Sequence, residues 1–182
     1  MVPIKLYKHN ISAIVDHFTR LSMEDRRLRF GYCPTDELIE KYVQNAFTEK
    51  DSWFGCLGDR GEIVATSHIS VLPDGEAEFG LSIDKEFRGK GLGNQLFERA
   101  VSACKVKGIT GIFMQCLSEN MAMRHMASKN RMSIVTRGGE SEAHATLRYQ
   151  PFTGAIEEAG WTNVVLIDNF FRSTTSWYKW LK

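Results

Sequence analysis

The chain has 182 residues, of which 43% are hydrophobic and 25% are charged. This length suits one ordinary domain with its own core and is short for two that fold independently. The balance of residues is that of a water-soluble globular protein and excludes a disordered or fibrous chain. The formal net charge of +1 predicts no overall field that would recruit nucleic acid. Arg26, Arg27 and Arg29 form a local basic cluster; a solvated helix face is the simpler interpretation, and a partner surface is the alternative.

No uninterrupted apolar stretch approaches the roughly 20 residues that cross a bilayer, and residues 1–10 lack the apolar segment of a secretion signal. We therefore predict a cytoplasmic protein with no membrane partner. The four cysteines, Cys33, Cys56, Cys104 and Cys116, lie far apart and form no CxxC pair. This spacing predicts neither a metal site nor a disulfide framework, and reduced thiols fit it better.

The first 50 residues are predicted to be largely helical. Apolar residues between Ile11 and Phe18 repeat at helical spacing. Ser22 followed by Asp25 resembles a capping box that opens a second helix. Thr35 can cap a third helix, whose apolar stripe runs from Leu38 to Val43.

The hydrophobic period changes after residue 50. Residues 53–57, 62–71 and 77–83 are typical of strands, and two turn sequences rich in Gly and Asp separate them. We expect three antiparallel strands in a meander. A helix then follows a glycine-rich loop and ends at Gly108, a buried strand covers 109–117, and a helix covers 120–130. Strands are predicted over 133–137 and 143–149 around the turn Gly138-Gly139. After Pro151, residues 164–167 resemble a strand and 176–181 a short helix.

The loop Arg88-Gly89-Lys90-Gly91-Leu92-Gly93 stands between a predicted strand and a predicted amphipathic helix. Glycine lets a backbone turn tightly and direct successive N–H groups at phosphate oxygens. The helix N-terminus adds about half a positive charge, to which Arg88 and Lys90 contribute. The loop therefore predicts a site for a pyrophosphate group.

A glycine-rich loop is also found in nucleotide-binding proteins. A phosphate loop of that kind would need GxxxxGK[ST], which residues 88–93 do not supply. A dinucleotide fold would need GxGxxG near the start of a βαβ unit. The chain has GxGxG after strands that are expected to be antiparallel, so both nucleotide interpretations are disfavoured.

The loop resembles that of the GNAT superfamily of acyl-CoA-dependent N-acetyltransferases. Their phosphate loop reads [RQ]-x-x-G-x-[GA], which Arg88, Gly91 and Gly93 match at every fixed position. The resemblance extends from about residue 62 to residue 147 and includes Asn120 at the start of a helix. The segments 21–30, 77–79 and 119–123 are similar to those of bacterial protein-lysine acetyltransferases.

The resemblance implies an α/β (α+β) GNAT fold, in which a mixed, largely antiparallel sheet has flanking helices and a splayed strand pair that binds CoA. It divides a single domain over 1–182 into a helical N-terminal part (1–50), an acetyl-CoA-binding core (51–150) and a C-terminal strand and helix (151–182). The implied CoA-binding residues are the strand backbone at Leu81, Ser82 and Ile83, the six loop residues Arg88, Gly89, Lys90, Gly91, Leu92 and Gly93, and Asn120. A helix cap is the alternative role for Asn120, and the two roles can coexist.

Acetyl transfer to an amine needs a group that takes the proton from a cationic acceptor. Glu76 and Glu78 stand two apart on one strand and therefore share a face. Glu78 is the preferred base because it occupies the family-like Ala-Glu-Phe segment, and an exposed structural carboxylate is the alternative for both. His68 is expected to belong to a local hydrogen-bond network rather than to relay a proton.

Many members of the superfamily place a tyrosine seven residues after the helix-starting Asn, where it protonates the leaving thiolate. Here that position is Ala127, and neither Ser128 nor His125 is expected on the same helix face. A dedicated general acid is therefore in doubt.

The predicted function is an N-acetyltransferase that uses acetyl-CoA as co-substrate and no metal. The acceptor amine is left open between a protein lysine, a peptide N-terminus and a small amine. The alternative is a non-catalytic acyl-CoA-binding regulatory module, which Ala127 keeps open. Aromatic residues near the C-terminus are expected to close a small core, with an acceptor pocket or a homodimer surface as alternatives.

Overall fold

The computed structural model describes residues 1–148, 159–161 and 163. In this part of the chain one sheet of seven strands has the order β1-β2-β3-β4-β5-β7-β6. The strands are β1 (Ile4–Leu6), β2 (Ser52–Leu57), β3 (Ile63–Val71), β4 (Glu76–Ile83), β5 (Gly111–Leu117), β6 (Ser133–Arg137) and β7 (Glu140–Thr146). The helices are α1 (Ile11–Thr19), α2 (Met23–Phe30), α3 (Asp36–Asn45), α4 (Leu92–Val106) and α5 (Met121–Lys129), with short 3-10 turns at Lys8–Asn10 and Lys85–Phe87.

The N-terminal helices begin where the capping residues predict. The Ser22 hydroxyl accepts a hydrogen bond from the Asp25 N–H at 3.1 Å and donates one to the Asp25 carboxylate at 2.8 Å. Thr35 accepts from the Leu38 N–H at 3.4 Å. Strand β1 was not expected, because three residues carry too little pattern to be recognised and only pairing with β2 defines them.

The sheet confirms the antiparallel meander of β2, β3 and β4. Within the described residues, β4 and β5 form a parallel pair, whereas the remaining pairs are antiparallel. The last strand begins at Glu140, three residues before the predicted start at 143. The reason is that Gly138-Gly139 form a two-residue turn, which pairs Arg137 directly with Glu140.

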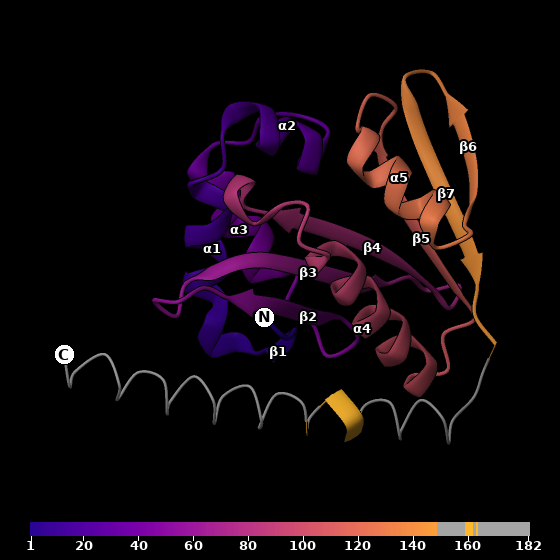
Figure 1. Ribbon diagram of the computed structural model, residues 1–182, viewed down its shortest axis with the longest axis horizontal. Coiled ribbons are helices and arrows are strands. Elements are labelled where there is room, and N and C mark those ends of the chain that lie inside the picture. The colour runs from indigo at the N-terminus through magenta and orange to yellow at the C-terminus, as the bar shows by residue number, and fades with distance from the viewer. Residues whose placement is uncertain (149–158, 162, 164–182) are drawn as a thin grey trace.

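Two hydrophobic clusters lie on opposite faces of the sheet. The larger combines α4 and α5 with β2 to β7, around fully buried side chains such as Phe79, Leu96 and Ile112. The smaller packs α1 and α3 against the other face, around Phe18, Ile39 and other apolar residues. Figure 1 shows α4 lying across the sheet while α1 and α3 lie beyond it. Helix α3 buries Ile39 and Val43 of its predicted apolar stripe, whereas Leu38 of the same stripe is 46% exposed.

The predicted strand at 164–167 and the predicted helix at 176–181 lie outside the described residues. Of the described helices, none is both long and apolar enough to cross a membrane. The described residues also contain no group of three or more His, Cys, Asp or Glu side chains placed to hold a metal ion.

Candidate active site

Strand β4 separates from β5 part of the way along its length. It pairs with β3 from Ala77 to Ile83. Its pairing with β5 stops at Glu78, opposite Phe113, although both strands continue. In Figure 1 the strands diverge, β4 toward the N-terminal helices and β5 toward α5. The second half of β4 therefore has an edge without a strand partner on this side, where an extended ligand can add backbone hydrogen bonds.

A cavity of about 820 Å³ opens at this divergence. Its walls come from α2 and the residues after it, Tyr42 of α3, strands β3, β4 and β5, the glycine loop and α5. The cavity lining contains nine of the residues that the sequence predicted to be catalytic or CoA-binding: Glu78, Leu81, Ser82, Ile83, Arg88, Gly89, Gly91, Gly93 and Asn120. The other three lie elsewhere: Glu76, Lys90 and Leu92 are not part of the cavity wall.

Gly91 sets the entry to helix α4. It is the N-cap of the helix with a left-handed φ of 80°, and no side chain caps this helix end. The first N–H groups of α4 therefore lack the intrahelical partners that later residues have. A Cβ built on Gly91 would meet no atom within 4 Å. The loop thus leaves open space in front of backbone donors, which is the form that a phosphate cradle takes.

The two basic side chains of the loop are already engaged within the protein. Arg88 donates a hydrogen bond to the Ile83 carbonyl at 3.0 Å and forms an ion pair with Asp25 at 2.6 Å. The Lys90 ammonium lies over the Phe87 ring at 4.8 Å. Arg88 therefore ties the loop to α2, and the backbone N–H groups at the start of α4 are the donors that stay available to an anion.

Asn120 joins the two sides of the cavity. Its side-chain oxygen accepts from the Met123 N–H at 3.2 Å, so the residue caps α5. Its side-chain nitrogen donates to the Leu28 carbonyl of α2 at 3.3 Å. The residue is 9% exposed and borders the cavity. The capping role is confirmed, and the role in CoA binding stays a prediction.

Glu78 and Glu76 differ in what they face. Glu78 lies at the point where β4 leaves β5, with Ser70 of β3 opposite it, and both residues line the cavity. The Glu76 carboxylate instead stands over Gly111, where an added Cβ would lie 2.6 Å from it. Of the two carboxylates, Glu78 alone borders the cavity.

A chain of polar side chains that the sequence did not predict lies beside Glu78. The Arg29 guanidinium donates to the Tyr42 hydroxyl at 3.0 Å, and that hydroxyl lies 3.1 Å from His68 Nδ1. The hydroxyl oxygen accepts from Arg29, which leaves its proton free to donate to a neutral His68 whose Nδ1 is unprotonated. On the other side of the ring, His68 Nε2 lies 3.5 Å from the Asp51 carboxylate. The expected hydrogen-bond network around His68 is present. Its partners were not predicted, because the sequence placed Tyr42 in an apolar stripe and Arg29 on a solvated helix face.

Burial controls the charge of this chain. It lowers the pKa of His68, and the nearby Arg29 charge lowers it further, while Asp51 opposes both effects. Burial alone would raise the pKa of Asp51, but hydrogen bonds from His68 and the Val71 N–H outweigh it and lower that pKa. At neutral pH His68 is therefore uncharged and Asp51 is a carboxylate.

Helix α5 contributes a different set of side chains from the expected one. Ala127 is 1% exposed and packs in the core, and it does not border the cavity. His125 was expected to lie off the relevant face, but it lines the cavity together with Lys129. Met123 and Met126 line it as well, whereas Met121 is 67% exposed. The described lining therefore has no tyrosine from α5.

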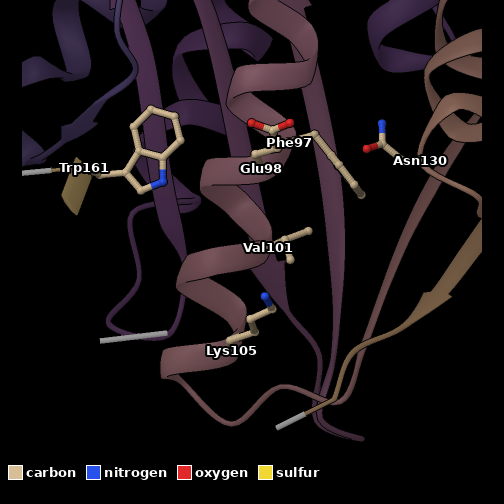
Figure 2. A pocket seen from close by; sticks show the side chains of 6 residues that line it. All are labelled: Phe97, Glu98, Val101, Lys105, Asn130 and Trp161. Carbon is tan, nitrogen blue, oxygen red and sulfur yellow. The ribbon is translucent and has the colours of Figure 1, made fainter. Parts of the chain in front are cut away.

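A second, smaller cavity of about 370 Å³ lies along helix α4. Figure 2 shows Trp161 on one side of the helix and Asn130 on the other, with Val101 and Lys105 along its length. None of the residues that the sequence analysis placed in the active site lines it. The cavity at the β4–β5 divergence is therefore the candidate active site.

The sequence matches the profile of the acetyltransferase (GNAT) family over residues 16–131. The chain therefore belongs to this family, whose members are acetyl-CoA-dependent N-acetyltransferases. A comparison with curated proteins gave no match.

Solved structures share the fold at low sequence identity. The GNAT domain of S. lividans PAT aligns with a TM-score of 0.70 and 18% identity, covering 80% of this chain and 89% of its own. A phosphinothricin acetyltransferase from Sinorhizobium meliloti in complex with AcCoA gives 0.67 and 12%, covering 80% and 88%. The ribosomal-protein-S18-alanine N-acetyltransferase from Escherichia coli gives 0.61 and 16%, covering 82% and 94%. These likenesses establish the fold alone, and the two enzymes that are named for their acceptors act on different ones.

Proposed function

We propose that this protein transfers the acetyl group of acetyl-CoA to an amine, with Glu78 as the general base. The observation that carries the proposal is the position of Glu78, which lines the cavity where β4 leaves β5. Acetyl-CoA supplies an acetyl group that is activated as a thioester. A protein lysine is the acceptor that the sequence resemblance suggests, and a small amine is its competitor.

The residues around the divergence fit the parts of acetyl-CoA. The backbone of the α4 N-terminus, with open space at Gly91, suits the pyrophosphate. The free edge of β4 beyond Glu78, which includes Leu81 and Ile83, suits hydrogen bonds to the pantetheine arm. The same N–H groups would polarise the thioester carbonyl. Asn120 would add a polar contact at the far wall.

Glu78 has a clear chemical task in this arrangement. A lysine-like amine has a pKa near 10.4, so only about one molecule in 10³ is neutral at pH 7. Glu78 would accept the proton, after which the amine nitrogen attacks the acetyl carbon. The new C–N bond forms, the C–S bond breaks, and CoA leaves as a thiolate. The nitrogen then loses its remaining extra proton to that thiolate or to water, which gives the neutral amide. Because a thiol has a pKa near 8.5, the thiolate is a tolerable leaving group without the tyrosine that Ala127 replaces.

Glu76 provides a matched control for testing this role. Glu78→Gln keeps the shape of the side chain and removes the proton acceptor, so turnover should fall by about 10²- to 10⁴-fold at saturating amine while acetyl-CoA affinity is retained. Glu76→Gln, on the same strand but outside the cavity wall, should change turnover little. Thiol release with a panel of amines measures turnover, and calorimetry measures acetyl-CoA binding.

The same measurements separate this function from its alternative. A protein that binds acetyl-CoA and releases no thiol above the hydrolytic background with any amine would be a non-catalytic binding module. Equal turnover of the two glutamine variants and the parent would place the base elsewhere.

A further inference from the structure

Arg29 is set apart from its neighbours in the basic cluster of α2. Arg26 forms an ion pair with Asp36, and Arg27 pairs with Glu24 and Glu119. Arg29 has no carboxylate within 4.0 Å among the described residues, and its Nε is buried without a hydrogen-bond partner there. Its guanidinium instead borders the cavity that contains Glu78.

The protein holds this guanidinium in a fixed place. The rings of Phe18, Phe30 and Tyr42 surround it, with centroids 5.7, 5.1 and 5.8 Å from its central carbon. The Tyr42 hydroxyl accepts one of its N–H groups and is itself held by His68. Arginine has five N–H donors in a planar fork; Nε is buried and Tyr42 takes one donor of Nη2, so the other Nη donors are left for a ligand.

The glycine at position 80 allows the guanidinium to approach strand β4. A Cβ at Gly80 would lie 2.5 Å from Arg29 Nη2 and 2.9 Å from its Cζ. Gly80 and Glu78 share one face of β4, because they stand two residues apart on the strand. The Arg29 guanidinium therefore lies at strand position 80, about 6.6 Å along β4 from position 78, which carries the proposed base.

A lone cation beside the base disfavours a simple amine as acceptor. The acceptor arrives protonated, so an uncompensated guanidinium near Glu78 would repel it. An acceptor that carries its own negative charge would instead satisfy Arg29 while offering its amine to Glu78. Arginine binds carboxylates through two parallel hydrogen bonds, which makes a carboxylate the anion that suits this fork.

The spacing between the Arg29 guanidinium and the proposed base matches the size of an α-amino acid. In such a molecule the amine nitrogen and the carboxyl carbon lie about 2.5 Å apart. With one charge-assisted hydrogen bond of about 2.8 Å at each end, it spans roughly 8 Å, which is of the same order as the roughly 6.6 Å between positions 78 and 80 along the strand. We propose that the acceptor is a small α-amino acid, whose carboxylate is bound by Arg29 and whose α-amine is presented to Glu78. This inference rests on the proposed acetyl transfer and adds the class of its substrate.

The proposal predicts a preference that the parent protein shows without mutation. Free L-amino acids and their α-carboxamides have the same amine and side chain, and only the acid carries the anion. We expect a kcat/KM for thiol release about 10- to 100-fold higher with the best acid than with its amide. A carboxylate raises the pKa of the neighbouring amine, so at neutral pH a smaller fraction of the amine is uncharged in the acid than in the amide. A preference for the acid therefore cannot come from a larger supply of neutral amine.

Three variants assign this preference to Arg29. Arg29→Gln should lower kcat/KM for the acid about 10- to 100-fold, mainly through KM, and leave the amide and acetyl-CoA affinity nearly unchanged. Arg29→Lys should recover part of the loss. Arg27→Gln removes the same charge from the same helix but outside the cavity, so it should behave as the parent does.

The outcomes distinguish this inference from the function on which it rests. Thiol release with amides, a peptide N-terminus or a lysine side chain as fast as with free amino acids overturns the inference and leaves acetyl transfer intact. The inference is also overturned if Arg29→Gln lowers kcat/KM equally for the acid and the amide, or if it lowers acetyl-CoA affinity by as much as it lowers kcat/KM for the acid. Absence of thiol release with every amine refutes the proposed function itself, and this inference with it. If Arg29→Gln does not fold, the comparison of acid and amide with the parent protein decides the question.

Discussion

The backbone of the glycine loop should control acetyl-CoA binding, and Gly91→Ala tests this with little else disturbed. Gly91 has a φ of 80°, and an added Cβ would contact no protein atom within 4 Å. The cost to the fold is therefore conformational, roughly 1–2 kcal/mol for an L-residue in the left-handed region. Alanine also reduces the freedom of the unfolded chain, which offsets about 0.4–1 kcal/mol of that cost. For a chain of this length the melting temperature should fall by only about 2–4 °C per kcal/mol.

The effect on binding should be larger than the effect on stability. The open space at Gly91 faces the cavity, so the methyl group would occupy part of the volume that the pyrophosphate needs. A shift of the α4 N–H donors by even a few tenths of an ångström weakens several hydrogen bonds together. We expect acetyl-CoA affinity to fall at least about tenfold, which is about 1.4 kcal/mol.

Gly75→Ala is the matched control for conformational strain. Gly75 has a φ of 88°, an added Cβ there also meets no atom within 4 Å, and the residue lies outside the cavity wall. Both variants should lose similar stability in a thermal melt, while only Gly91→Ala should lose affinity in calorimetric titration with acetyl-CoA. If the two variants bind acetyl-CoA equally well, the cofactor does not lie against this loop.

Two further outcomes follow from buried titratable groups. Burial raises the pKa of the Cys104 thiol to about 12, whereas Cys33 is exposed. A thiol reagent at pH 8 should therefore label Cys33 rapidly and spare Cys104 until the protein unfolds. Mass spectrometry of the labelled peptides checks this, and fast labelling of Cys104 in the folded protein would contradict it. Because burial lowers the pKa of His68, the unfolded chain binds a proton there at a higher pH than the folded protein does, and stability should fall as the pH drops below about 6.5. The stabilisation from Asp51, whose pKa is also lowered, is present at neutral pH and persists until the pH falls through its folded-state value. Denaturant unfolding from pH 7.5 to 4.5 should show a weaker pH dependence for His68→Gln, and an unchanged dependence would refute the assignment.

Local rules identified most of the elements. Capping residues Ser22 and Thr35 gave the starts of two helices, because a side-chain oxygen that satisfies a helix N–H acts over three residues of sequence. The glycine loop also gave the start of α4, where Gly91 is the N-cap in the left-handed region that glycine adopts readily and no side chain caps the helix. Strand β1 and the true start of β7 were missed, since both depend on which backbone lies beside them.

The sequence by itself determined the family, the glycine loop at the start of α4 and a short list of candidate site residues that contained Glu78 and Asn120. Only the tertiary structure decided that Glu78 faces the cavity and Glu76 does not, because Glu78 is the last residue of β4 that pairs with β5 and Glu76 lies two residues before this divergence. It alone brought Arg29 of α2 over Gly80 of β4, since side chains far apart in sequence meet only when the helix packs on the sheet. The local pattern of charges showed three similar arginines; burial and pairing made one of them different, and that difference is what points to the acceptor.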